Sequence, residues 1–235
     1  MQIGLHAVVM GARQQEKRLE VIANNLANAG TVGFKKEGVH FKDFIDEATY
    51  TQHDQGAFRQ TGQAFDVALR GKGFLRVQSD KGVLYTRAGN LTLNNDNTLI
   101  TQEGWPVLGR GGGPIQVSGR DVRIELDGQV FNRPDDEGAN AEYTVVDTLD
   151  VVEFGSDVAL DRVGRGYFRS RDENQQPGPV SDVEVQQGAV EEANFNVVEE
   201  MARMIDTQRS YEAYYKTLQI FQEEDSQVIS KLGNP

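Results

Sequence analysis

Apolar residues at the start of the chain recur in steps of three and four, the spacing of one face of an α-helix. They predict a helix over the first 28 residues, with a heptad seam opposite polar residues such as Arg13 and Lys17. Asn28–Ala29–Gly30 predicts its end, because Gly or Asn adopts the left-handed conformation that terminates helices. We interpret the seam as an assembly interface formed by Leu5, Val8, Ala12, Leu19, Ile22 and Leu26.

Two glycines interrupt this first pattern. Gly4 and Gly11 lie inside the predicted helix, and each costs about 1 kcal/mol of helix stability relative to alanine. An isolated helix that carries both is marginal in water.

The other end of the chain repeats the design. Asn196 is a predicted N-cap, with Glu199 three residues later, and the next glycine is Gly233. The resulting helix of about 35 residues exceeds the usual globular length and indicates a coiled coil. Its predicted interface consists of Val197, Met201, Met204, Ile205, Gln208, Tyr211, Tyr215 and Leu218.

Either seam alone is also explained by an ordinary helix packed on its own domain. Two seams at opposite ends of a mostly non-helical chain favour pairing of the ends. Such a long, thin pair leaves apolar surface for neighbouring copies.

The middle of the chain has the pattern of short strands. Runs of β-branched and aromatic residues are divided by turn signals, including Asn94–Asn97. The predicted strands lie at 65–69, 73–77, 83–87, 90–93, 98–101, 115–117, 122–126, 129–131, 148–154 and 166–169.

These patterns predict an α+β fold in which long terminal helices pair as a coiled coil around a central all-β domain, with the pairing coupled to assembly. Residues 1–40 and 190–235 form the predicted discontinuous helical domain, and 65–169 the β-rich outer domain. Residues 41–64 and 170–189 are predicted extended connections, with a polar loop or linker over 170–182.

Composition narrows the function. Apolar residues make up 38% of the 235 residues and charged residues 26%, which is typical of a folded, soluble protein. The net charge of −12 argues against a nucleic-acid partner, which needs a basic surface. The absence of cysteine excludes disulfides and thiolate sites. The start has no basic region, and the longest apolar run is too short for a signal peptide or a membrane span, so we expect any export to occur without a cleaved signal.

No constellation for catalysis or cofactor binding emerges. His6, His40 and His53 lie far apart in the sequence, so we predict no metal site. The segment Gly109–Pro114 lacks the Lys-Ser/Thr ending of a phosphate loop and is predicted to be a β–β connection. The acidic pairs Asp135–Asp136 and Glu191–Glu192 are interpreted as solvated loop charges. We therefore expect no enzyme activity and no cofactor.

Two motifs near the first helix suggest a family. Ala23–Asn28 followed by Thr31–Lys35 resembles the N-terminal signature of the bacterial flagellar rod and hook proteins, with Val32 in place of a threonine. Further matching segments are Gln60–Gly62, Phe65–Leu69, Gly71–Phe74, Tyr85–Asn90, Asn194–Met201 and Met204–Glu212. The motif residues are Asn24, Asn25, Leu26, Ala27, Asn28, Gly33, Phe34 and Lys35.

The resemblance implies a structural role in the flagellar basal body. The terminal helices would line the inner tube of a rod, the β domain would lie outside, and copies would stack into a drive shaft that crosses the periplasm and transmits torque to the hook. Implied partners are other copies of the chain, proximal and distal rod proteins, and the flagellar type III export apparatus.

The specific subunit and two other classes of protein stay open. Within this family, chain length excludes the small rod proteins and the much longer hook protein. The segment Trp105–Ile115 resembles the F-type subunit, which has a single β domain and joins the proximal rod, and the slightly larger distal rod subunit is the alternative. A monomeric secreted binding module, such as an adhesin, would instead need a concave apolar pocket and ordered ends. An enzyme would need clustered titratable groups in the β domain.

Overall fold

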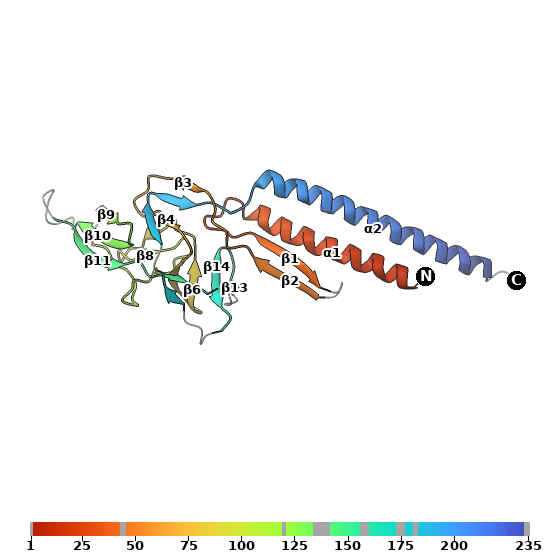
Figure 1. Ribbon diagram of the computed structural model, residues 1–235, viewed down its shortest axis with the longest axis horizontal. Helices are drawn as coiled ribbons and strands as arrows, with labels where there is room; N and C mark the ends of the chain where they lie inside the picture. The colour runs from red at the N-terminus through yellow and green to blue at the C-terminus, as the bar shows by residue number, and fades with distance from the viewer. Residues whose placement is uncertain are drawn as a thin grey trace. The chain divides into compact units, whose positions relative to one another are not determined.

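The computed structural model describes residues 2–42, 46–118, 121–133, 142–155, 160–172, 177–180 and 183–232 (Figure 1). Side chains are not described at 2, 3, 42, 46, 47, 179 and 225–232. The chain forms two compact units, each built from separate stretches of sequence. Residues 1–29, 36–53 and 195–235 form the helical unit, and residues 30–35 and 54–194 form the β unit. The predicted α+β fold class is confirmed.

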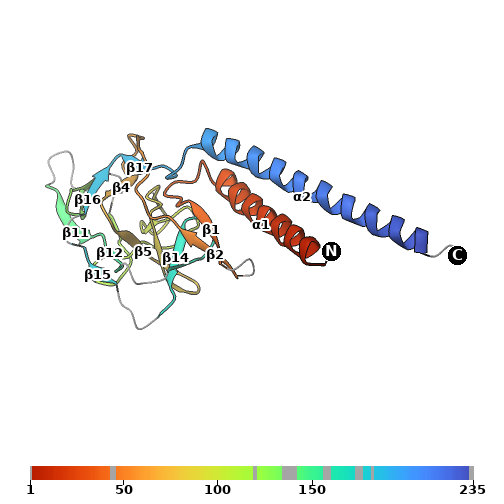
Figure 2. The same ribbon diagram turned by 45° about the vertical axis from the view of Figure 1, so that its right-hand side comes forward.

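The helical unit is built on two long helices. Helix α1 (Gln2–Ala27) and helix α2 (Val197–Leu232) lie side by side in both views, with the two chain ends at the same end of the pair (Figures 1 and 2). A hairpin of strands β1 (Glu37–Lys42) and β2 (Asp46–Thr51) completes the unit, and β1 contacts α1. The helices predicted at both ends of the chain are therefore present and antiparallel.

The start of α2 follows the sequence prediction. The Asn196 side-chain Oδ1 accepts a hydrogen bond of 2.9 Å from the backbone N–H of Val198, as an N-cap does. Helix α1 ends at Ala27 as expected, but the reason given for its end was wrong. Neither Asn28 nor Gly30 is left-handed, and the first left-handed residue after α1 is Gly33, with a φ of +67°.

The β unit contains one six-stranded antiparallel sheet in the order β13-β14-β6-β5-β12-β15. Its strands are β5 (Phe74–Ser79), β6 (Gly82–Thr86), β12 (Val151–Glu153), β13 (Leu160–Arg162), β14 (Tyr167–Ser170) and β15 (Gly178–Pro179). A three-stranded sheet joins β11 (Thr144–Thr148), β10 (Gln129–Arg133) and β9 (Asp121–Ile124).

Three strand pairs complete the β unit. They are β4 (Val67–Arg70) with β16 (Glu184–Gln187), β3 (Phe58–Gln60) with β17 (Ala189–Glu191), and β7 (Thr92–Leu93) with β8 (Leu99–Ile100). The turn between β7 and β8 is the predicted Asn94–Asn97 segment, in which Asn97 is left-handed and the Asn94 side chain accepts two backbone N–H bonds.

Both faces of the six-stranded sheet are apolar, because successive side chains of a strand point to opposite faces. In β5, Leu75 belongs to the large core, which also includes Val107 and Val130. Its neighbour Phe74 belongs to a smaller aromatic cluster, in which it meets the Phe168 ring edge to face at 5.6 Å.

The secondary structure of some stretches differs from the one predicted. The stretches 41–64 and 170–189, expected as extended connections, contain β2, β3, β15 and β16. Residues 115–117, expected as a strand, make a single bridge between Thr98 and Gln116. Residues 173–176 and 181–182 of the expected linker lie outside the described part of the chain, and the predicted domain boundaries stay a prediction. Among the described residues, no helix is long and apolar enough to span a membrane.

Candidate assembly interface

Helix α2 turns one stripe of side chains towards α1. The stripe advances in steps of four and three and contains Glu200, Met204, Thr207, Tyr211, Tyr214, Leu218 and Phe221, all buried or half-buried. Met204, Tyr211 and Leu218 were in the predicted seam, whereas Glu200, Thr207 and Tyr214 were not. All six predicted seam residues of α1 are buried or half-buried, and Ile22 is the most enclosed of them.

Three contacts set the register of the two helices. Asn25 bonds Glu200, Gly11 lies against Tyr214, and Gly4 lies against Phe221. The contacts are fourteen and then seven residues apart on each helix, in opposite directions, which is the heptad spacing of an antiparallel pair.

Gly11 has a packing role that the sequence analysis missed. A β-carbon at this position would lie 2.6 Å from the Tyr214 ring, so only glycine leaves room for the tyrosine as it is placed. At Gly4 the nearest Phe221 atom would be 4.0 Å away, an ordinary contact. The sequence contained a signal for this packing. Tyr214 and Phe221 are seven residues apart, and so are Gly4 and Gly11.

A second apolar stripe on α2 is exposed. We call Val198, Met201, Ile205 and Tyr215 the outer stripe, and their exposed fractions are 73%, 54%, 52% and 54%. The predicted interface residues Val197 and Gln208 are exposed as well. The structure thus divides the predicted C-terminal seam into residues that face α1 and residues that do not. An assembly role for either part stays a prediction.

The first half of the family motif ties the helical unit together. The Asn25 side chain accepts a 2.9 Å bond from the Glu37 N–H and donates a 2.9 Å bond to the Glu37 carbonyl, as a neighbouring strand would. The same amide donates to Glu200 Oε1 at 3.0 Å, so one buried residue joins α1, β1 and α2. Asn24 donates to the Glu37 carboxylate, and Asn28 donates to the Asn24 carbonyl.

A buried ion pair adds to this junction. Lys36 Nζ lies 2.5 Å from Glu200 Oε2, and both side chains are nearly inaccessible to water. Removing one member of such a pair leaves an uncompensated buried charge, which is strongly destabilising. The pair therefore couples the start of α2 to the start of the hairpin.

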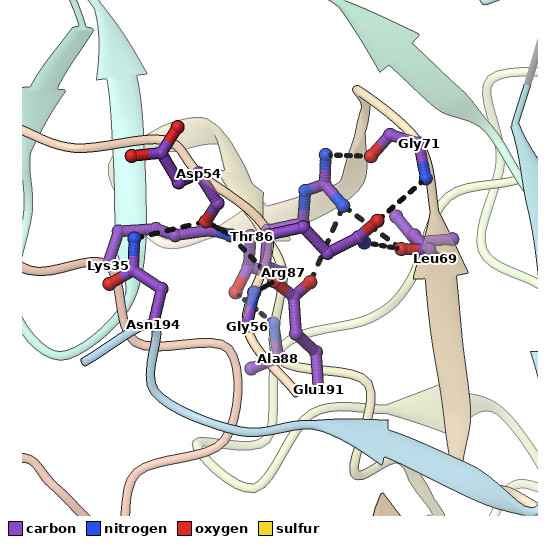
Figure 3. A network of polar contacts seen from close by, with 11 residues as sticks. Lys35, Asp54, Gly56, Leu69, Gly71, Thr86, Arg87, Ala88, Glu191 and Asn194 are labelled. Carbon is purple, nitrogen blue, oxygen red and sulfur yellow. Dashed lines mark hydrogen bonds and ion pairs between the residues drawn. The ribbon is translucent and has the colours of Figure 1, made fainter. Parts of the chain in front are cut away.

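The second half of the motif lies in the β unit (Figure 3). Lys35 Nζ donates a 2.6 Å bond to Glu191 Oε1 and a 2.7 Å bond to the Asp54 carbonyl. From the other side, Arg87 lies 3.4 Å from Glu191 Oε2 and donates to the carbonyls of Leu69 and Gly71. The cluster joins the segment after α1, the segment before β3 and the end of β17.

The cluster is enclosed by protein. The side chains of Lys35, Glu191 and Arg87 are 1%, 0% and 4% exposed. Burial lowers the pKa of Lys35 and of Arg87, and the attraction of Glu191 opposes part of both effects. The interpretation of Glu191 as a solvated loop charge was wrong, because Glu191 ends strand β17 with its carboxylate between two cations. Its neighbour Glu192 is exposed, as expected.

Neighbouring motif residues fix the same segment. Gly33 is left-handed, and a β-carbon there would lie 2.4 Å from the Arg87 backbone carbonyl carbon. Phe34 is buried beneath the Arg162 guanidinium, which lies 4.4 Å from the ring centroid. Each of the residues Gly33, Phe34 and Lys35 thus has a specific structural reason for its identity.

The segments considered for other chemistry have structural roles. Gly109 and Gly113 close a hairpin tip by a 2.9 Å backbone bond, with a bridge between Leu108 and Pro114, as predicted. His40 stacks on Tyr50 with ring centroids 4.3 Å apart. Within the described residues there is no group of three metal-ligating side chains. Asp135–Asp136 lies outside the described residues.

Comparison with known protein families places three parts of the chain. Residues 8–35 match a family described as flagella basal body rod protein. Residues 68–132 match the flagellar hook protein FlgE/F/G D1 domain, and residues 186–231 match the flagellar basal body rod FlgEFG protein C-terminal region. The first match contains Gly11 and Asn25 of α1, and the last contains Glu200, Tyr214 and Phe221 of α2.

Full-length relatives agree with these matches. The chain is 31% identical to the flagellar basal-body rod protein FlgF of Mesorhizobium japonicum, over 100% of this chain and 99% of the relative. It is 31% identical to FlgF of Caulobacter vibrioides over 97% and 98% of the two chains. It is 30% identical to the basal-body rod protein FlgG of Bacillus subtilis over 91% and 93%.

Paired terminal helices, a β unit that holds the second half of the motif in a buried ionic cluster, and relatives that align from end to end lead to one conclusion. This chain belongs to the flagellar basal-body rod protein family and is a structural, non-enzymatic subunit of the rod.

Proposed function

We propose that the chain polymerises with other copies of itself through its terminal helices and forms part of the helical drive shaft that crosses the periplasm. The observation that carries this proposal is the outer stripe of α2. Four large apolar side chains are more than half exposed on a helix whose neighbouring stripe already packs on α1. Contiguous exposed apolar surface marks interaction sites.

The polymerisation proposal is tested by placing charge on the outer stripe. The variant Met201→Asp/Ile205→Asp changes two exposed residues, so each subunit should still fold while filament formation and swimming are lost. Ala213→Asp is the matched control, because Ala213 is exposed on α2 and lies neither three nor four residues from any member of the outer stripe. Sedimentation of the purified protein and motility of the bacterium that carries this chain give the readouts. Normal filaments and swimming by the double variant would contradict the proposal.

We further infer that the chain is the F-type subunit, which joins the proximal rod. Support comes from the match to the Mesorhizobium FlgF over the full length of both chains, and from the resemblance of the Trp105–Ile115 segment. The distal subunit stays the alternative, since the identity to the Bacillus FlgG is similar. Gold-labelled antibodies against the β unit should mark isolated basal bodies at the proximal end of the rod. Labelling at the distal end would favour the alternative.

Contacts with proximal and distal rod proteins and passage through the flagellar export apparatus belong to the same proposal, and rod family membership supports both. If the chain is exported in this way, it should stay inside cells of a strain that lacks the export apparatus. In the parent strain it should reach the basal body. Equal export by both strains would contradict this part of the proposal.

A further inference from the structure

We propose that the outer stripe of α2 docks into a groove of the helical unit on a second copy of this chain, so that copies add head to tail. The inference rests on the proposed function, because it names the two surfaces through which polymerising copies would meet. Both surfaces belong to the helical unit.

The groove lies where three elements of this unit meet. It has a volume of about 320 Å³ and is lined by Ile22 of α1, Val39 and Tyr50 of the hairpin, and Thr207 of α2, among others. Such a volume admits a few side chains and not a whole helix. The apolar members of the lining, Val21, Ile22, Val39 and Tyr50, suit contact with side chains such as Met201 and Ile205.

The groove and the outer stripe lie on opposite flanks of the α1 contact. Residues three and four apart share one face of a helix. Arg203 and Thr207 line the groove, Met204 faces α1, and Met201 and Ile205 lie beyond it on the other flank. A surface and its complement on different flanks of one helix make a heterologous contact, which extends into rings or helical filaments instead of closing as a two-fold dimer.

A second copy is the occupant that the surfaces favour. The outer stripe continues the intramolecular α1–α2 contact without a break, so docking extends an interface that the chain already forms. Met201 lies three residues before Met204, and Tyr215 lies four residues after Tyr211, so members of the stripe share a helix face with residues that face α1.

The test uses cysteine cross-linking, which is specific to the introduced positions because the chain itself contains no cysteine. Ile205→Cys marks the outer stripe, and Gln52→Cys marks the groove. Under conditions that promote filaments, a short bifunctional maleimide should link an equimolar mixture of the two variants into dimers. The double variant Gln52→Cys/Ile205→Cys should give a ladder of longer species. Ala213→Cys paired with Gln52→Cys is the matched control and should give no product, because Ala213 is exposed on α2 outside both surfaces.

The alternative outcomes separate this inference from the proposed function. If Ile205→Cys alone forms dimers and the double variant gives no ladder, the outer stripes of two copies contact each other. This result would overturn the head-to-tail contact. Filaments without cross-links would leave polymerisation standing and reject these two surfaces. The absence of both filaments and cross-links would reject both proposals.

Discussion

Gly33 adopts a φ of +67°, and a β-carbon added there would lie 2.4 Å from the Arg87 backbone carbonyl carbon. Arg87 directly follows strand β6, and its backbone atoms cannot turn aside as the end of a long side chain can. Gly33→Ala therefore combines a strained φ with a backbone clash, and we expect a loss of roughly 2–4 kcal/mol in the free energy of unfolding. Urea unfolding of the purified protein measures this loss.

Gly62 provides the control for Gly33. Its φ is +68°, but nothing lies within 4 Å of a β-carbon placed there. Gly62→Ala should therefore cost only the backbone term, about 1–2 kcal/mol. Equal losses for the two variants would mean that the approach to Arg87 does not matter.

A second prediction at the residue scale concerns the buried cluster. Glu191→Gln removes the carboxylate that lies between the Lys35 ammonium and the Arg87 guanidinium. Breaking a buried ion pair leaves uncompensated charge, so we expect a loss of about 3–5 kcal/mol in the free energy of unfolding. Thermal melting of the β unit is the measurement.

The neighbouring glutamate serves as the matched control. Glu192 pairs with Arg59 at 3.0 Å, and both side chains are about half exposed. Because water and salt screen such pairs, Glu192→Gln should change the free energy of unfolding by about 0–1 kcal/mol. If Glu191→Gln changes the free energy of unfolding by no more than Glu192→Gln does, the cluster does not stabilise the fold.

At the scale of elements, the packing of α1 on α2 requires glycine at position 11 but not at position 4. Alanine is about 1 kcal/mol better than glycine within a helix. Gly4→Ala should therefore stabilise the pair, because its β-carbon would make an ordinary 4.0 Å contact with Phe221. Gly11→Ala should instead lower the free energy of unfolding by about 1 kcal/mol, because it displaces the Tyr214 ring and loses apolar contact.

A double-mutant cycle checks this explanation. In a Tyr214→Ala background the ring is gone, so Gly11→Ala should become stabilising by about 1 kcal/mol. The helical circular dichroism signal during urea unfolding reports each change. If Gly11→Ala keeps the same effect in both backgrounds, then Tyr214 is not its cause.

At the scale of the whole molecule, the two compact units predict the products of limited proteolysis. The ends of the β unit are tied by the Asn194 side chain, which bonds the Asp54 carbonyl, and by the Glu192 N–H, which bonds the Ala57 carbonyl. Residues 30–35 also belong to this unit, and Lys35 lies in its buried cluster, so we expect the longest stable fragment to begin near residue 30 and end near residue 194. Mass spectrometry identifies the fragment, and a stable core confined to 65–170 would show that β3, β16 and β17 do not protect the chain.

Local patterns in the sequence determined the elements. The heptad spacing determined both helices, the Asn196 cap set the start of α2, and alternation with turn residues placed strands such as β5, β6 and β10. These features depend on residues close together in the chain, so a sequence reports them directly. Short strands such as β3 and β17 were missed, because three residues carry too little periodicity and their partners are far away in the sequence.

Only the tertiary structure decided which residues meet. The sequence could not show that the partner of Lys35 is Glu191, 156 residues away, or that the partner of Asn25 is Glu200. It also could not divide the apolar residues of α2 between α1 and the exposed outer stripe, since both stripes repeat with the same heptad period. Burial in a fold is set by contacts between distant segments, and a one-dimensional pattern records that a face is apolar without recording what covers it.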